Sequence, residues 1–332
     1  HCLYLELGHP GRADWRRLTA NARIFSMVAP SALYSRIVSI SNIESAYVEI
    51  FRKFSTQDKV GKYKGVDNLN LDDLLHNASE VVAEIRKELL EFFPIRPTIQ
   101  YSVPKKSGER RLVYVCSIKD RIKSLAISRV LDPIFEKRYS PFLFSYRSQY
   151  PSYYAGKSVT RRYKRFFGQD FLLVTDIKDY APRIDRSILL QKLCNIGLPQ
   201  DVIALLKLFI EAPIFGESEV VARGVLPGIP LAAEFENIYL TDMDFEIGSK
   251  VALYRRVGDD LIIFDKNLAK VQKAFSIVKQ YCANLGLTYN IKKTKLTNSC
   301  EPFEFLGYHF ENRKISIAKS SMSKIKSSWR CK

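Results

Sequence analysis

Two adjacent aspartates, Asp259 and Asp260, stand between two apolar runs, residues 251–257 and 261–264, that have the composition of strands. Burying neighbouring like charges beside a sheet costs free energy unless a cation neutralises them. The pattern therefore predicts a tight hairpin whose tip, at Gly258, holds divalent metal. A solvent-exposed turn is the alternative interpretation, because Gly and Asp both tolerate turn geometry.

A third carboxylate, Asp176, favours the metal site over the exposed turn. It follows the short apolar run at residues 171–174, and antiparallel pairing of that strand with the hairpin would bring three acidic side chains together. Two Mg²⁺ ions about 4 Å apart, or Mn²⁺ in their place, would then clamp an attacking 3′ hydroxyl and a leaving pyrophosphate. The three aspartates thus point to phosphoryl transfer.

Composition favours a folded chain with a polyanionic partner. The 332 residues are 46% hydrophobic and carry a formal net charge of +17, a bias that promotes salt-sensitive association with nucleic acid. A membrane surface is the competing partner, but the chain has no run of 18 apolar residues, so no membrane partner is expected. Six scattered cysteines without C-x-x-C spacing and only four histidines argue against structural zinc and for a reduced, cytoplasmic protein.

Two basic segments are candidate binding surfaces. Four cations flank Gly108 on an expected strand–loop–strand and suit a clamp on nucleotide phosphates: Lys105, Lys106, Arg110 and Arg111. Residues 157–165 hold five basic and no acidic residues, namely Lys157, Arg161, Arg162, Lys164 and Arg165. With Tyr163, Phe166 and Phe167 nearby, and Tyr146 and Arg147 upstream, they suit a groove that tracks a nucleic-acid backbone. A solvated basic hairpin and a solvated helix face are the plain alternatives.

Two further segments have weaker signals. The bent loop at residues 224–230 is either a connection or a place where Gly228, which lacks a side chain, lets the backbone approach a base pair. Lys293 lies in a lysine-rich stretch that is either surface charge or the source of a proton for pyrophosphate.

Hydrophobic periodicity predicts an α+β fold, because helices and strands interleave without a regular βαβ period. Helices are expected over residues 41–58, 70–93, 120–139, 186–196, 200–211 and 268–285, and from the 224–230 loop to about residue 245. Strands are expected at residues 99–103, 111–115 and 171–174, in the aspartate hairpin, and in a final hairpin at residues 303–310 and 314–317.

The order of these segments resembles the reverse transcriptases. Asp176-Ile-Lys-Asp-Tyr, residues 224–240 and Val257-Gly-Asp-Asp are similar to their motifs A, B and C, and residues 285–294 and 305–308 to motifs D and E. Residues 103–111 and 144–148 are similar to the fingers motifs of the prokaryotic branch. That branch includes group II intron, retron, diversity-generating and defence-associated enzymes. The resemblance spans about residues 85–317.

The resemblance implies a right-hand polymerase with fingers, and a palm built from an antiparallel sheet with packed helices. Residues 1–40 are an unassigned N-terminal segment, 41–170 the fingers with an N-terminal helical region, 171–317 the palm, and 318–332 the start of a thumb or a tail. Since the sequence stops soon after motif E, we expect a thumb that is absent or truncated and a weak grip on duplex.

The resemblance also assigns roles to individual residues. Asp176, Asp259 and Asp260 become metal ligands, Lys293 the motif D lysine, and Leu306-Gly307 a primer grip. Nucleotide contacts are expected from Lys105, Lys106, Arg110, Arg111, Ile177, Lys178, Asp179, Tyr180, Ala181, Pro227 and Gly228. The implied activity is RNA-directed DNA synthesis, and the implied partners are an RNA template, a DNA or RNA primer and nucleoside triphosphates, with a dedicated noncoding RNA as a further candidate.

Departures from the family pattern bear on specificity. Val257 replaces the usual aromatic residue of motif C, Leu226 and Pro227 stand where motif B has Pro-Gln, and Ala232 replaces its Ser. These changes favour defence-associated or unclassified members of the family. Ala181 replaces the Phe or Tyr whose ring blocks a sugar 2′-hydroxyl, so weak discrimination against ribonucleotides is expected.

Two rival functions follow from the same residues. An RNA-dependent RNA polymerase suits Gly-Asp-Asp and Ala181, but motif A lacks the second Asp expected there and Phe305-Leu-Gly-Tyr fits the reverse transcriptases better. A catalytically idle palm that only binds RNA is the other rival. Three clustered carboxylates without a cation would repel one another, which argues against it.

Overall fold

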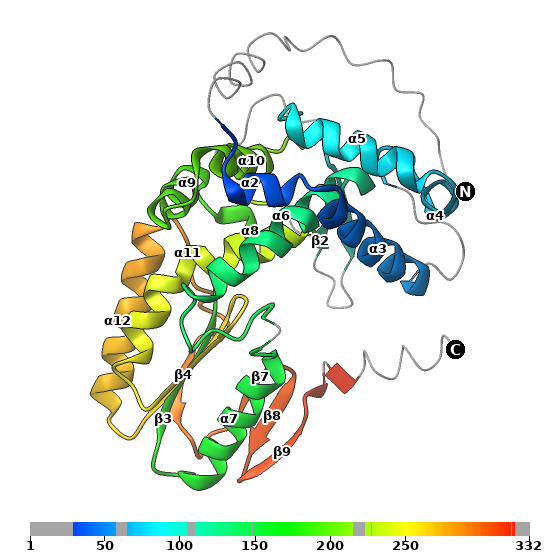
Figure 1. The fold of residues 1–332 in the computed structure, drawn as a ribbon. Coiled ribbons are helices and arrows are strands. Elements are labelled where there is room, and N and C mark those ends of the chain that lie inside the picture. Colours follow the sequence, from blue (N-terminus) through cyan, green and yellow to red (C-terminus); the bar gives the residue numbers. More distant parts are fainter. Residues whose placement is uncertain are drawn as a thin grey trace.

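The computed structural model describes residues 29–57, 65–104, 110–147, 149–214, 223–226, 228–319 and 321–322. The helices are α2 (Ala32–Ile37), α3 (Ile40–Gln57), α4 (Leu71–His76), α5 (Ala78–Leu90), α6 (Ile118–Glu136), α7 (Ser152–Arg165), α8 (Tyr180–Arg183), α9 (Arg186–Asn195), α10 (Gln200–Ile210), α11 (Pro230–Gly248) and α12 (Leu268–Asn284). The strands are β1 (Ile99–Pro104), β2 (Arg110–Val115), β3 (Phe171–Asp176), β4 (Leu253–Val257), β5 (Asp260–Asp265), β6 (Lys295–Asn298), β7 (Phe303–Phe305), β8 (Tyr308–Glu311) and β9 (Lys314–Ile317). Figure 1 shows a helical part that carries the β1–β2 hairpin and a second part built on the sheet of β3, β4 and β5. Within the described ranges, no helix is both long and apolar enough to cross a membrane.

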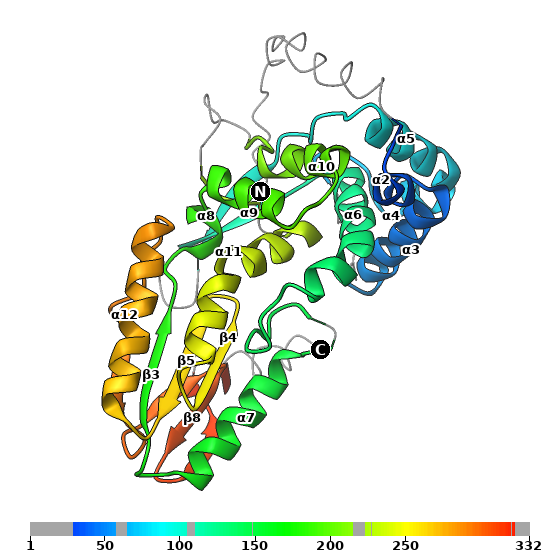
Figure 2. The same cartoon turned by 60° about the vertical axis from the view of Figure 1, so that its left-hand side comes forward.

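A four-stranded antiparallel sheet is the centre of the second part. Its strand order is β4-β5-β3-β6. Helices α11 and α12 lie against one face, whereas α7 and the small sheet β7-β8-β9 lie against the other (Figure 2). Alternate residues of β3 accordingly enter two different apolar cores, Leu173 on the α11 side and Leu172 on the α7 side. Burial on both faces explains why these strands are continuous apolar runs rather than alternating ones.

The helical part is fixed by a buried cluster of charges between α5 and α6. Lys123 forms ion pairs with Glu88 at 2.8 Å and with Asp120 at 2.5 Å, and Arg96 reaches Asp120 at 3.2 Å. Lys123 and Asp120 are each 1% exposed. Charges so deeply buried are tolerated because each has an opposite partner.

Several elements differ from the sequence-based expectation, among them the short helices α2 and α8, which were not predicted. The single helix predicted over residues 70–93 is two helices, because Asn77 leaves helical geometry between α4 and α5. Strand β6 was not predicted, and it pairs with β3 so that Lys295 lies opposite Val174. The final hairpin is a three-stranded sheet, since residues 303–305 form a separate strand.

Parts of the predicted domain scheme lie outside the described residues. The described chain reaches only residues 29–40 of the predicted N-terminal segment and residues 318, 319, 321 and 322 of the predicted thumb or tail. The other boundaries, at residues 41, 171 and 317, stay predictions.

A buried acid in α11 makes the fold sensitive to pH. Glu234 is 8% exposed and accepts hydrogen bonds from the hydroxyls of Tyr139 and Ser128. Burial raises its pKa to about 7, against the lowering effect of those two hydrogen bonds. Because the folded-state pKa lies above the unfolded one, the protonated acid stabilises the fold at low pH, and that contribution is lost as pH rises through about 7.

We therefore expect the free energy of unfolding to fall by roughly 2–3 kcal/mol more in the wild type than in Glu234→Gln when pH rises from about 5 to about 8. Urea denaturation of both proteins across this pH range measures the difference. Subtracting the profile of the Gln variant removes the contribution of the other titrating groups, which the two proteins share. Parallel pH profiles for the two proteins would show that Glu234 does not carry the effect.

Candidate active site

The backbone brings the predicted aspartates to one end of the four-stranded sheet. In the antiparallel register of β3 and β5, Asp176 lies directly opposite Asp260. One residue on, the backbone N–H of Ile177 donates to the carbonyl of Asp259 at 3.0 Å. Gly258 adopts φ +63, a left-handed conformation that glycine accepts without strain and that closes the β4–β5 turn. Strand pairing alone thus places all three aspartates around one turn.

The side chain of Asp176 is buried and incompletely paired. It is 4% exposed, and its Oδ2 forms an ion pair with the ammonium of Lys293. Its Oδ1 is buried with no hydrogen-bond partner within the described residues. The loop that carries Lys293 is held in place because the N–H of Asn290 donates to the carbonyl of Asp176 at 2.9 Å.

The electrostatics of the turn show a shortage of positive charge. Burial, and then the neighbouring Asp259, raise the pKa of Asp260 to about 6. Burial also raises the pKa of Asp259, and the charge of Asp176 adds to the rise. Burial by itself lowers the pKa of Lys293, but its hydrogen bond and ion pair with Asp176 outweigh this and raise it. By surface exposure Asp259 is exposed and Asp260 is half-buried. Two adjacent carboxylates whose ionisation is opposed by desolvation and by neighbouring negative charge are hard oxygen donors that suit a divalent cation.

The side chains do not form a ligand set in their present arrangement. No group of three or more His, Cys, Asp or Glu side chains among the residues described is placed to hold a metal ion. In this arrangement the carboxylate of Asp176 contacts the ammonium of Lys293. The assignment of the three aspartates as metal ligands therefore stays a prediction, supported by the backbone register.

Two cavities flank the aspartate turn. One, of about 610 Å³, is lined by Asp176, Asp260 and Lys293 on one side and by Leu306 and Gly307 on the other. It joins the predicted catalytic residues to the predicted primer grip. A second cavity, of about 580 Å³, lies on the other side of Gly258 and is lined by Asp259, Ser145, Tyr146 and Ser152, among others. The Tyr146 side chain is 70% exposed and its backbone is left-handed at φ +54.

A buried ion pair supports the aspartate turn from below. Arg256 and Asp244 both have fully buried side chains. Arg256 Nε donates to Asp244 Oδ1 at 2.8 Å, and Arg256 Nη2 donates to Asp244 Oδ2 at 2.7 Å. Arg256 also donates to the carbonyls of Gly258, at 3.1 Å, and of Asn237, at 3.2 Å. This pair was missed from the sequence. The sequence feature that could have revealed it is a charged residue inside an otherwise apolar strand, because a charge buried there needs an oppositely charged partner.

A loop before α7 is fastened to the same turn. Ser145 Oγ accepts from the N–H of Gly258, and the Ser145 carbonyl accepts from the side-chain amide of Asn237 at 2.9 Å. Through Asn237, this loop and Arg256 belong to one hydrogen-bonded network under the carboxylates.

The predicted nucleotide contacts are placed unevenly. Ile177 is fully buried, and Tyr180 is 5% exposed with its hydroxyl donating to the carbonyl of Glu236. Their side chains belong to the core, so a nucleotide contact at either position has only the backbone available. Lys178 and Asp179 are exposed, Ala181 is half-buried, and Gly228 is exposed at φ +95. Lys105, Lys106 and Pro227 lie outside the described residues, as do the side chains of Arg110 and Arg111.

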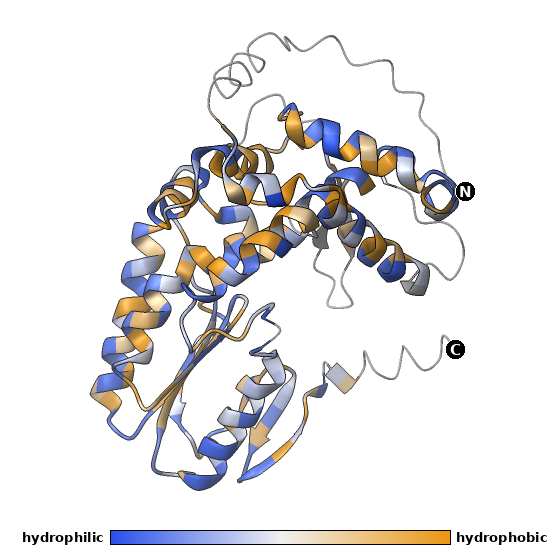
Figure 3. Cartoon of the chain, in the orientation of Figure 1, coloured by the Kyte–Doolittle hydropathy of each residue, from blue (hydrophilic) through white to orange (hydrophobic). Residues whose placement is uncertain are grey.

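The basic helix α7 presents part of the predicted nucleic-acid surface to solvent. Its exposed cations are Lys157, Arg161, Lys164 and Arg165, and Figure 3 shows α7 mainly in the colours of hydrophilic residues. Arg162 instead pairs with buried Asp170 at 2.7 Å.

Two further predicted contacts on this surface are corrected. Arg147 is 6% exposed and pairs with Glu136 at 2.7 Å, so its guanidinium, like that of Arg162, is engaged within the protein. Tyr163, predicted as a stacking surface, is fully buried against Phe303 and Phe310. Local charge and aromatic content did not distinguish these core residues from surface ones.

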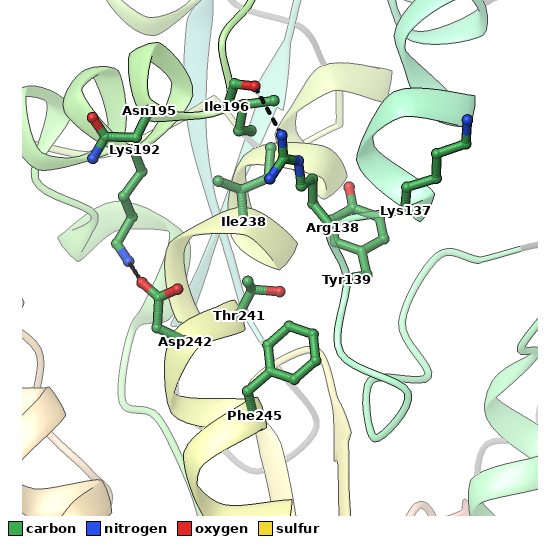
Figure 4. A pocket seen from close by; sticks show the side chains of 10 residues that line it. All are labelled: Lys137, Arg138, Tyr139, Lys192, Asn195, Ile196, Ile238, Thr241, Asp242 and Phe245. Atoms are coloured by element: carbon green, nitrogen blue, oxygen red, sulfur yellow. Dashed lines mark hydrogen bonds and ion pairs between the residues drawn. The ribbon is translucent and has the colours of Figure 1, made fainter.

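A separate cavity of about 390 Å³ lies between the end of α6, α9 and α11 (Figure 4). There Lys192 pairs with Asp242, and Arg138 donates to the carbonyl of Ile196 at 3.2 Å. Its wall also includes Phe245. None of the predicted site residues lines it, so it provides control positions for experiments on the aspartate turn.

The antiparallel sheet, the carboxylate turn at its end and the adjoining helices form an α+β fold consistent with the palm and fingers of a template-directed nucleotidyltransferase. Residues 103–310 match the family described as "Reverse transcriptase (RNA-dependent DNA polymerase)", and the chain belongs to this family. It is an RNA-directed DNA polymerase, as the sequence predicted.

Two curated proteins are similar to the chain. The "Retron Ec86 reverse transcriptase" of Escherichia coli is 22% identical over 265 residues, which cover 77% of this chain and 76% of that protein. "Maturase-like protein 1" of Euglena longa is 23% identical over 197 residues, covering 58% of this chain and 41% of that protein. The predicted likeness to the prokaryotic type of reverse transcriptase is confirmed.

Solved telomerase structures also align with the chain. The telomerase of Candida albicans, solved with a fragment of telomeric RNA, gives a TM-score of 0.48 at 14% identity and covers 73% of this chain. The truncated apo telomerase of Candida tropicalis gives 0.48 at 15% identity and covers 67%. This chain matches 49% and 55% of those two chains, about half of their length.

Proposed function

We propose that the chain copies an RNA template into DNA by a two-metal mechanism centred on Asp176, Asp259 and Asp260. The observation that supports it most directly is the strand register, which sets Asp176 opposite Asp260 and ties Ile177 to Asp259. When bound, two Mg²⁺ ions, or Mn²⁺ as an alternative, would stabilise negative charge on the attacking 3′ oxygen and on the leaving pyrophosphate. The unpartnered Oδ1 of Asp176 and the raised pKa of Asp260 are consistent with such a pair of cations.

Lys293 would donate a proton to the leaving pyrophosphate from its Nζ. Its side chain is 65% exposed, although the carboxylate it contacts is 5% exposed, so the ammonium can swing away from Asp176 towards solvent. Its raised pKa keeps it protonated at neutral pH. A proton donor is useful here because pyrophosphate leaves with extra negative charge.

The remaining predicted roles follow from position. Leu306 and Gly307 line the same 610 Å³ cavity as Asp176 and Asp260, which supports the proposal that a primer end lies there. Lys178 and Asp179 are exposed and lie between Asp176, at the end of β3, and Ala181. An incoming nucleoside triphosphate would contact this segment. The expected partners are an RNA template and a DNA or RNA primer. The four cysteines described as free thiols fit a reducing compartment, and we place the protein in the cytoplasm.

Ribonucleotides should be used with little penalty. Ala181 is half-buried, and its carbonyl accepts from the N–H of Val225 at 3.1 Å, which fixes its methyl group where relatives carry a ring. We expect Ala181→Phe to raise the preference for deoxyribonucleotides about tenfold to a hundredfold, because the ring would clash with a 2′-hydroxyl. Primer extension on an RNA template, with dNTPs and separately with rNTPs, measures both the activity and this ratio.

Ala181→Val is the matched control, since it adds bulk without a ring. No extension by the wild-type protein with either nucleotide set would count against the proposed mechanism. A wild-type preference for dNTPs as strong as that of Ala181→Phe would instead contradict only the role of Ala181.

A further inference from the structure

Three exposed tyrosines gather where α7 meets the β7-β8-β9 sheet. Tyr153, Tyr154 and Tyr308 are 60%, 44% and 47% exposed. The rings of Tyr153 and Tyr154 lie 4.2 Å apart between centroids. Tyr308 lies beside Gly156, where an added methyl group would meet the Tyr308 ring edge at 4.0 Å. Large apolar rings left in solvent at one place mark a contact surface.

This tyrosine surface lies beside the aspartate turn on two sides. Ser152, next to Tyr153 in α7, lines the 580 Å³ cavity with Asp259. Tyr308 follows directly on Leu306-Gly307, which line the 610 Å³ cavity with Asp176 and Asp260. The tyrosine surface is therefore directly adjacent in sequence to residues that line both cavities beside the carboxylates.

The charges around the tyrosine surface favour a polyanion. Helix α7 contains no acidic residue, and Lys157 and Arg161 continue its exposed side beyond Tyr153. The nearby acids lie on the other face of the small sheet, where Glu304 and Glu311 contact His309 at 3.6 and 3.5 Å. Since side chains alternate along a strand, Tyr308 shares the α7-facing side with buried Phe310, opposite to His309.

We propose that Tyr153, Tyr154 and Tyr308, with Lys157 and Arg161, hold the primer–template duplex just behind the point of nucleotide addition. The inference rests on the proposed function, because a strand extended at the aspartates is paired with its template up to the 3′ end. Tyrosine hydroxyls donate to phosphates and the rings pack on sugars, contacts that position a duplex without reading its sequence. The two cations neutralise phosphates further along the helix.

Binding of a fluorescent RNA–DNA duplex, followed by anisotropy at several salt concentrations, tests the proposal. We expect Tyr153→Ala/Tyr154→Ala to raise Kd about tenfold with an unchanged salt dependence, because no charge is lost. Lys157→Ala/Arg161→Ala should weaken binding and flatten the slope of log K against log salt by about 1.8, for two phosphates. The matched control is Phe245→Ala, an exposed aromatic residue (46%) in α11 beside the separate cavity, which should bind as the wild type does.

Two more variants make the test decisive. Tyr153→Phe/Tyr154→Phe keeps the rings and should retain part of the affinity that the alanine variant loses. Circular dichroism should show all variants folded, since both side chains lie at the surface. The proposal is overturned if Tyr153→Ala/Tyr154→Ala binds the duplex with the wild-type Kd, or if Phe245→Ala loses as much duplex affinity. It is also overturned if the tyrosine variant loses affinity only for single-stranded RNA. Duplex binding can be measured without catalysis, so the two proposals fail separately. A wild-type protein that cannot extend primers would refute the mechanism. An active wild type together with normal duplex binding by Tyr153→Ala/Tyr154→Ala would refute this surface alone.

Discussion

Replacing both Asp259 and Asp260 with alanine should abolish nucleotide addition and leave RNA binding intact. Without these carboxylates the turn has only Asp176 to hold cations, so the transition-state charge is no longer neutralised. The loss should be about a thousandfold or more in the rate of primer extension, since metal clamping contributes several kcal/mol. Binding should persist because it depends on the net charge of +17, which the double substitution makes more positive.

A matched control removes a carboxylate from outside the site. Asp242 lies in α11 with a side chain 61% exposed and pairs with Lys192 in the separate cavity, so Asp242→Ala should extend primers at the wild-type rate. Extension by the double variant at that rate would mean that the aspartate turn is not the active site. Loss of RNA binding in the double variant, with a normal circular dichroism spectrum, would make the turn part of the binding surface instead.

The second large effect concerns stability. Arg256→Met should lower the free energy of unfolding by about 3–5 kcal/mol, because it leaves the fully buried Asp244 carboxyl without its ionic partner. Urea denaturation followed by circular dichroism measures it. Arg129 and Glu49 form a matched exposed pair, with side chains 40% and 56% exposed at 2.9 Å, and Arg129→Met should cost less than about 1 kcal/mol.

A double substitution separates stability from function. Arg256→Met/Asp244→Leu removes both charges and should recover much of the lost stability, as replacement of whole buried ion pairs often does. It should not recover the rate of extension, because the Gly258 carbonyl would still lack the guanidinium that holds the turn. A single variant as stable as the wild type would refute the first expectation. A double variant with full activity would refute the positioning role of Arg256.

Much of the site was predictable because its signals are local in the sequence. The apolar runs on either side of Asp259 and Asp260 predict paired strands, and the run before Asp176 predicts the third strand of the same sheet. Asp176 stands at the end of its strand and Asp260 at the start of the second hairpin strand. The two strands must therefore run antiparallel for the acids to meet. The motif order added the family, which the match over residues 103–310 confirms.

The failures share a physical cause, namely that the sequence does not show which side chains and strand edges find a partner in the tertiary structure. Arg162 and Arg147 look like surface cations, yet Asp170 and Glu136 hold them within the protein. Strand β6 has the sequence Lys-Leu-Thr-Asn, too short and polar for a periodic signal. It exists because β3 offers an unpaired edge, which is a property of the tertiary structure.

The fastening of Ser145 to Gly258 has a consequence for how the enzyme responds to its substrate. The same short segment contains exposed Tyr146 and leads within a few residues into α7 and its tyrosines. We expect a duplex seated on that segment to affect the aspartate turn through this one hydrogen bond to the Ser145 hydroxyl. Binding of the duplex and positioning of the three aspartates would then depend on the same segment of chain.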